Sequence, residues 1–143
     1  MNKIAVVYWT CSGNTEIMAN CITDGARAAG ATVSQFTPAD FSAADLDSYD
    51  VVAFGCPAMG AETLEESEFE PMFSDLEGQL KGRKIALFGS YGWGDGQWMR
   101  DWYSRCADDG ATLFGDEGLI VNETPDDTAE HVCSELGREL ATW

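Results

Sequence analysis

Residues 6–16, VVYWTCSGNTE, decide the fold of this 143-residue chain. An apolar, β-branched run ends there in a cluster of hydroxyl groups, and the residues that follow have the spacing of a helix. Thr10, Ser12 and Thr15 supply three hydroxyl donors, and Gly13 lets the backbone approach a ligand closely. The first N–H groups of a helix lack intrahelical partners and carry the positive end of its dipole. This segment therefore predicts an anion site made of hydroxyls and backbone amides.

The chain is strongly acidic. It has 25 Asp plus Glu against 8 Lys plus Arg, a formal net charge of −17. This charge repels nucleic acid and anionic membranes, so we expect neither as a partner. No Lys or Arg occurs between Lys3 and Arg27, so the predicted anion site has no side-chain cation, and none occurs between Ala28 and Leu80. The acidic excess has three open explanations: a solvated face, a docking face for basic partners, or an adaptation to salt.

The composition predicts a single globular domain over residues 1–143. Its hydrophobic share is 45%, yet no apolar run approaches the roughly 20 residues that span a membrane. Residues 1–4 lack the features of a signal peptide, and we expect a cytoplasmic protein. The five cysteines show no zinc-ligand spacing and are predicted to be reduced thiols. His131, the only histidine, is expected at the surface without a role.

Strand-like and helix-like segments alternate along the whole chain. Apolar runs predict strands over residues 3–9, 31–36, 50–55, 84–90 and 111–121, the last one broken by glycines. Helical spacing predicts helices over residues 15–29, 69–80, 96–109 and 125–143. Residues 41–49 fit a short helix or a turn. This alternation is typical of a parallel sheet covered by helices on both faces, which binds ligands at the carboxyl ends of its strands.

Three loops follow predicted strands and are therefore expected at one edge of the sheet: Thr10–Thr15, Cys56–Glu62 and Ser90–Gly96. The second and third loops combine glycines with a large apolar side chain, Met59 and Trp93 respectively. Exposing such side chains to water is energetically unfavourable. Either a flat aromatic ligand lies between them, or both fold back into the core.

Five motifs carry a resemblance over nearly the whole chain: YWTCSGNTE, CPAMGAE, LEESEFEP, GSYGWGDG and WMRDW. In them the chain resembles the short-chain, clostridial-type flavodoxins. The resemblance implies a three-layer α/β fold, with a five-stranded parallel sheet of order 2-1-3-4-5 and helices on both faces. It implies a low-potential one-electron carrier with non-covalent FMN, which shuttles between semiquinone and hydroquinone and replaces or parallels ferredoxin. Such a protein is not an enzyme; it is a monomer that exchanges electrons with basic-faced redox proteins.

The resemblance also assigns roles to residues of the three loops. Thr10, Ser12, Gly13, Asn14 and Thr15 would hold the FMN phosphate, with help from Ser90. Met59 would lie on the inner face of the flavin and Trp93 on its outer face. Glu62 would accept a hydrogen bond from flavin N3–H, and Gly92 would donate its backbone N–H. The remaining residues of the implied site are Cys11, Pro57, Ala58, Gly60, Ala61, Tyr91 and Gly94.

Two residues depart from the usual family pattern. Cys11 stands where many relatives have Gly, and Pro57 removes one backbone donor beside the ring. The Gly60–Ala61 peptide occupies the place where the family turns a carbonyl toward flavin N5 on reduction. Because Gly tolerates both peptide orientations, we expect Gly60→Thr to narrow the gap between the two reduction steps. Nearby carboxylates are expected to make the second reduction step more difficult.

Three other classes of protein share the beginning of the chain, the order of the sheet or the fold. Tyrosine phosphatases of low molecular weight need an Arg six residues after the catalytic Cys, and Ile17 follows Cys11 at that distance. Response regulators need acidic residues at the end of the first strand, where this chain has Tyr8, Trp9 and Thr10. An FMN-dependent quinone or NAD(P)H reductase on the same fold is the serious alternative. Such enzymes usually have extra segments for which this chain has little room.

Overall fold

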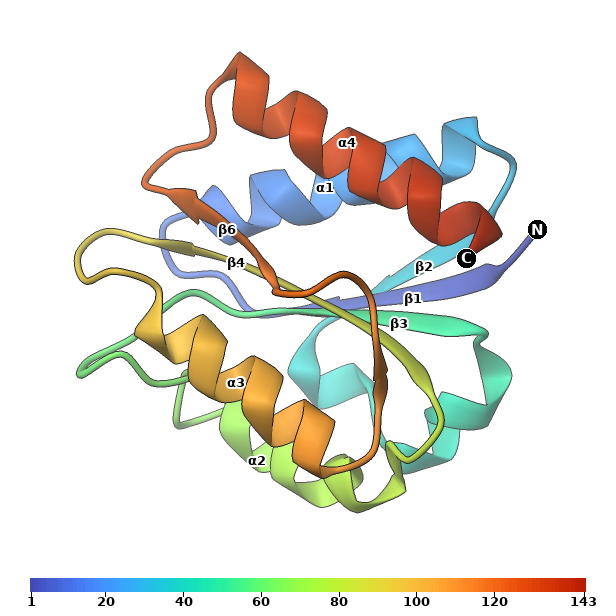
Figure 1. Cartoon of the computed structure of the whole chain (residues 1–143), viewed down its shortest axis with the longest axis horizontal. Coiled ribbons are helices and arrows are strands. Elements are labelled where there is room, and N and C mark those ends of the chain that lie inside the picture. The colour runs from blue at the N-terminus through green and yellow to red at the C-terminus, as the bar shows by residue number, and fades with distance from the viewer.

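The computed structural model describes residues 1–143 as a parallel sheet between two pairs of helices (Figure 1). The central strands β1 (Lys3–Tyr8), β3 (Val51–Gly55) and β4 (Lys84–Tyr91) are almost entirely buried, as their continuous apolar sequences predict. The edge strand β2 (Thr32–Phe36) pairs with β1. The strand order is β2-β1-β3-β4-β5, and every pairing is parallel. The predicted sheet order is therefore confirmed.

The last predicted strand consists of two pieces that both pair with β4. The short strand β5 (Thr112–Leu113) lies beside the beginning of β4, and β6 (Leu119–Asn122) lies beside its end. Between them the chain turns at Gly115, whose φ is +71°, and passes against Met99 at Gly118. A Cβ atom at Gly118 would lie 2.3 Å from the Met99 sulfur, so a larger residue there would require the Met99 side chain to move. The two glycines break the strand as predicted, and the sheet has a sixth, minor strand.

Each face of the sheet is covered by two helices. Helices α1 (Asn14–Ala28) and α4 (Asp127–Thr142) lie on one face, and α2 (Phe69–Leu76) and α3 (Gln97–Asp108) lie on the other (Figure 1). The helix predicted over residues 69–80 ends earlier, at Leu76, and a 3₁₀ turn at residues 77–79 follows it. The ambiguous segment is a 3₁₀ helix at residues 43–48, preceded by another at 38–40. No helix combines the length and the apolar character that a membrane span needs.

The packing of α1 against α4 fixes the place of the loop that precedes α1. The two helices approach closely because Gly25 and Gly137 face each other's backbones. A Cβ at Gly25 would lie 2.0 Å from the Ser134 carbonyl oxygen, and one at Gly137 would lie 2.0 Å from the Ile22 carbonyl oxygen. Neither position accepts a side chain, so these two residues set the separation of the helices.

Backbone hydrogen bonds beyond the strand ends hold the loops at the carboxyl edge of the sheet. Trp9 N–H donates to the Gly55 carbonyl at 3.1 Å, and Ala58 N–H donates to the Ser90 carbonyl at 3.0 Å. The loop after β6 joins them, since Glu123 N–H donates to the Tyr91 carbonyl at 2.7 Å. The three predicted loops therefore meet at one edge, together with a fourth loop after β6.

Candidate functional site

A cavity of about 410 Å³ opens where these loops meet. It lies at the carboxyl edge of a parallel sheet, where such folds bind their ligands. Its lining comes from all four loops: Thr10, Cys11, Ser12, Asn14, Thr15, Pro57, Ala58, Met59, Ser90, Tyr91, Gly92, Glu123 and Thr124.

The first loop presents an uncapped helix end to this cavity. Gly13 has a φ of +97° and precedes α1, and no side chain caps the helix. The Gly13 N–H donates to Thr10 Oγ1 at 3.2 Å, which closes the turn. The buried hydroxyls of Thr15 and Ser90 lie 2.8 Å apart and join this loop to the end of β4. Free N–H groups, hydroxyls and the helix dipole together suit an anion, and no cationic side chain is among them.

The second loop ends in a tight hairpin. Met59 and Thr63 exchange backbone hydrogen bonds of 2.8 and 2.9 Å across it. Gly60 and Glu62 both have left-handed backbones, with φ of +51° and +55°. Gly60 and Ala61 are exposed at the tip, and no atom lies within 4 Å of where a Gly60 Cβ would be.

The third loop exposes an indole ring to solvent. Trp93 is 67% exposed between Gly92 and Gly94, although Trp side chains in folded proteins are normally mostly buried. The neighbouring Trp98 is buried, and its Nε1–H donates to the Cys56 carbonyl at 3.1 Å, which ties the start of α3 to the second loop.

Glu62 connects the second and third loops. Its carboxylate lies against Gly94, where a Cβ would be 2.6 Å from Glu62 Oε1. This oxygen is buried and has no hydrogen-bond partner within the protein. A buried acceptor without a donor costs free energy. We therefore expect this oxygen to accept a hydrogen bond from bound water or from a molecule outside the chain.

The family model for flavodoxin matches residues 6–136. A flavodoxin of Megasphaera elsdenii is 51% identical over 138 residues, which cover 96% of this chain and 98% of that protein. A flavodoxin of Clostridium beijerinckii is 44% identical over 136 residues, which cover 95% and 97%. The solution structure of two-electron reduced Megasphaera elsdenii flavodoxin superposes with a TM-score of 0.89 and 50% identity over 98% of this chain and 99% of that one.

The chain belongs to the flavodoxin family. It is therefore an electron-transfer protein that uses a flavin, and it is not an enzyme with a substrate of its own. Two quinone-type NAD(P)H dehydrogenases, of Azorhizobium caulinodans and Nitrobacter winogradskyi, match over 33 residues, or 23% of the chain. The reductase alternative is not favoured by so short a match.

The residues at this edge of the flavodoxin fit a flavin. The uncapped start of α1 suits an anionic end of the ligand, and the half-buried Met59 and the exposed Trp93 suit an apolar ring. The Glu62 carboxylate lies between the second and third loops and offers a hydrogen-bond acceptor at the edge of the site. Bound flavin supplies the redox chemistry, because it accepts and donates single electrons.

The cavity contains most of the site residues that the sequence predicts. Six of the seventeen lie on the same loops but outside the lining of the cavity: Gly13, Gly60, Ala61, Glu62, Trp93 and Gly94. Sequence reasoning missed Glu123 and Thr124, which line the cavity from the loop after β6. Thr124 Oγ1 donates to Asn14 Oδ1 at 3.1 Å and so contacts the first loop directly. Ligands bind at the carboxyl ends of parallel strands. Glu123 and Thr124 follow the end of β6, so this rule identifies them once the break in the last strand is known.

Two buried groups lie in or next to the second loop. The Cys56 thiol does not ionise at neutral pH, and the Glu65 carboxylate is paired with hydrogen-bond donors. Burial raises the pKa of the Cys56 thiol to about 12, so this cysteine is an inert core residue. Burial also disfavours the charged form of Glu65, but backbone N–H groups outweigh it and lower its pKa. These donors are the amides of Ser67, Glu68 and Phe69, at 2.7–2.8 Å, so Glu65 caps the start of α2.

Proposed function

We propose that this flavodoxin binds FMN non-covalently in the 410 Å³ cavity and transfers electrons one at a time at low potential. The uncapped N-terminus of α1 with its three hydroxyls carries this proposal. A terminal phosphate monoester needs several donors and space at one end, and this loop offers both. Riboflavin has no anionic end for these donors.

The proposed ring position lies between the second and third loops. Trp93 would be covered on binding, and Met59 would contact the opposite face of the ring. Neither Pro57, which has no N–H, nor Ala58, whose N–H already binds the Ser90 carbonyl, offers a backbone donor there. Glu62 and Gly92 are therefore the proposed polar contacts of the pyrimidine side of the ring.

The Gly60–Ala61 peptide is the proposed element that responds to reduction. It is exposed, free of neighbouring side chains at Gly60, and held at both ends by the Met59–Thr63 hydrogen bonds. A left-handed φ of +51° is tolerated by glycine and strained for other residues. The peptide can therefore reorient without disturbing the rest of the hairpin.

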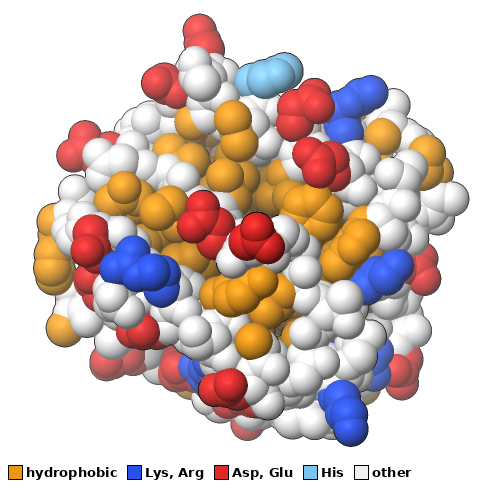
Figure 2. Space-filling model, viewed as in Figure 1, with side chains coloured by type: hydrophobic (Ala, Val, Ile, Leu, Met, Phe, Trp, Pro, Cys, Tyr) orange, Lys and Arg blue, Asp and Glu red, His pale blue; other side chains and the backbone are white.

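Basic-faced redox proteins are the proposed partners of a cytoplasmic, monomeric carrier. Figure 2 shows Asp and Glu side chains spread over the viewed face, with fewer Lys and Arg among them. A net charge of −17 attracts a basic partner at long range and speeds its encounter at low salt. The same charge opposes self-association.

Binding of FMN and of riboflavin, measured by fluorescence quenching, tests the phosphate assignment. We expect Ser12→Ala to weaken FMN binding about tenfold, the effect of one charge-assisted hydrogen bond, and to leave riboflavin binding unchanged. Ser48→Ala is the matched control, because Ser48 is exposed on a distant 3₁₀ helix. Equal losses for both ligands would contradict the assignment.

Stepwise anaerobic reduction of the FMN complex tests the electron-transfer mode. We expect two separate one-electron steps in the visible spectrum and no oxidation of NAD(P)H by the pure protein. A single two-electron step would contradict the proposal.

A further inference from the structure

A second cavity, of about 170 Å³, lies beside Glu62 and shares no lining residue with the first cavity. It is lined by the hairpin residues Glu62 and Thr63, and by Asp101, Trp102 and Arg105 of α3. Its volume is several times the roughly 30 Å³ that one water molecule occupies in the liquid. The lining is polar enough to hold water in a fixed position.

Two buried polar atoms of this lining have no hydrogen-bond partner in the protein. One is the acceptor Glu62 Oε1, and the other is the donor Nε1–H of Trp102. Trp102 is 2% exposed, so its indole N–H cannot turn to bulk solvent. A buried donor and a buried acceptor on one cavity are complementary, and buried polar groups are rarely left without partners.

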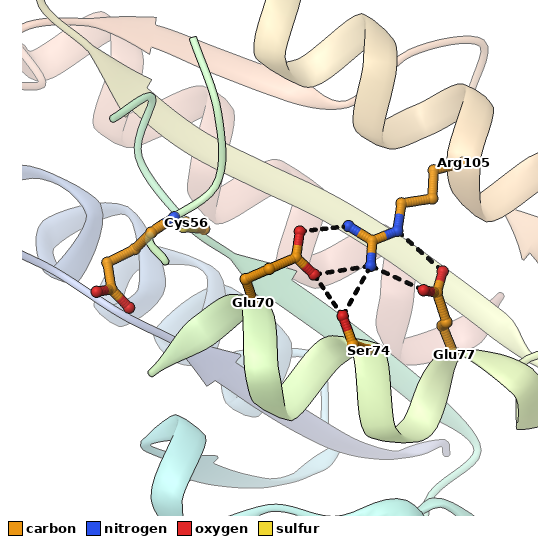
Figure 3. Close-up of polar contacts among 6 residues, drawn as sticks. Cys56, Glu70, Ser74, Glu77 and Arg105 are labelled. Carbon is orange, nitrogen blue, oxygen red and sulfur yellow. Dashed lines mark hydrogen bonds and ion pairs between the residues drawn. The ribbon is translucent and has the colours of Figure 1, made fainter. Parts of the chain in front are cut away.

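The other side-chain donors at this cavity are already used, and the Thr63 hydroxyl donates to the Met59 carbonyl. Trp98 Nε1–H donates to the Cys56 carbonyl. The guanidinium of Arg105 binds Glu70 and Glu77, as Figure 3 shows. Trp102 is therefore the side-chain donor of this lining that remains for Glu62.

We propose that a water molecule in this cavity accepts a hydrogen bond from Trp102 Nε1–H and donates one to Glu62 Oε1. Trp102 is then a positioning residue for Glu62. It holds Oε1 inward against Gly94 and leaves Oε2, which is not among the buried unpartnered atoms, for the flavin. This role rests on the proposed contact between Glu62 and FMN.

A double-mutant cycle tests the coupling between the two side chains. We expect Trp102→Phe, which removes the N–H and keeps an aromatic ring, to weaken FMN binding about tenfold in the wild-type background. In the Glu62→Ala background the same change has less than a twofold effect, because the group it positions is gone. Tyr103→Phe is the control: its hydroxyl binds the Gly115 carbonyl, so its loss leaves FMN binding unchanged in both backgrounds.

Equal losses in both backgrounds would show that Trp102 contributes only packing and would overturn the proposal, as would no loss in either. If the wild-type protein does not bind FMN at all, the proposed function itself fails, which this cycle distinguishes from failure of the positioning role.

A second measurement leaves Trp102 intact and needs no flavin. We expect the indole N–H signal of Trp102 in a ¹⁵N–¹H spectrum to shift, and its hydrogen exchange to accelerate, when Glu62 is replaced by Ala. The indole of Trp143, packed on Phe114 at the far end of the molecule, serves as the reference. An unchanged Trp102 signal contradicts the bridge even where Trp102→Phe proves unstable.

Discussion

Replacement of Arg105 by Met removes the cation that joins α2 to α3. Its guanidinium donates two hydrogen bonds to Glu70, at 2.7 and 2.8 Å, and two to Glu77, at 2.9 and 2.8 Å (Figure 3). It also lies 4.9 Å from the centre of the Phe73 ring. Met retains much of this packing, so the variant mainly leaves two carboxylates without their partner.

The expected cost lies between those of buried and exposed ion pairs. Breaking a fully buried pair costs about 3–5 kcal/mol, and an exposed pair contributes about 0–1 kcal/mol. The side chains of Arg105, Glu70 and Glu77 are 29%, 36% and 24% exposed, so solvent screens them in part. We therefore expect Arg105→Met to lower the free energy of unfolding by about 2–3 kcal/mol. With a urea slope near 2 kcal/mol per molar, the unfolding midpoint falls by about 1–1.5 M.

Urea unfolding of both proteins at pH 7, with equal flavin, provides the measurement. Arg100→Met is the control on the same helix, with the same change in net charge. Its pair with Asp95 has side chains 51% and 78% exposed, and we expect a loss below about 1 kcal/mol. Equal losses for the two variants would refute the reasoning.

The pH dependence supplies a second check. Arg105 holds the pKa of Glu70 and of Glu77 below the usual 4.5. A carboxylate with a lowered pKa stabilises the fold above its unfolded pKa, and that stabilisation disappears as pH falls through the folded pKa. The difference between wild type and Arg105→Met should therefore narrow in acid. A difference that stays constant to pH 3 would show that charge is not its cause.

Three further outcomes are expected. Gly25→Ala should destabilise the protein by about 1–3 kcal/mol because its Cβ would strike the α4 backbone, whereas Gly78→Ala, which meets open space, should be nearly neutral in the same unfolding assay. Burial and a hydrogen bond with Glu77 raise the pKa of Asp109 from 3.8 to about 6, so the charged form is disfavoured in the fold; Asp109→Asn should increase stability at pH 7, and the gain should vanish below about pH 4. Electron transfer to a basic partner should slow as salt rises, since screening shortens from about 10 Å at 0.1 M to 3 Å at 1 M, and salt-independent rates would contradict docking by charge.

The regular elements were largely predictable because local patterns determine them. Continuous apolar runs marked the buried strands, and the periodic apolar residues Phe69, Met72, Phe73 and Leu76 marked the buried side of α2. The end of that helix was wrong by one turn, since the 3₁₀ turn at residues 77–79 continues the same direction with different hydrogen bonds.

The site was predictable where residue type and loop position agree. Hydroxyls and glycines after a strand indicated the anion loop, and the structure places Thr10, Ser12 and Thr15 on one cavity. Glu123 and Thr124 carried no such signal, because they follow a strand that is broken and ordinary in composition. Only the pairing of β6 with the end of β4 brings them to the same edge.

The sequence by itself determined the class of fold, the order of elements and the loop that offers an anion site, because these depend on residues near one another in the chain. The tertiary structure decided which distant residues meet: the closeness of α1 and α4 at Gly25 and Gly137, the pairing of Arg105 with Glu70, and the shared cavity of Glu62 and Trp102. Those contacts join residues up to 115 positions apart (Ile22 and Gly137). Their geometry follows from close packing across the sheet, and no local pattern encodes it.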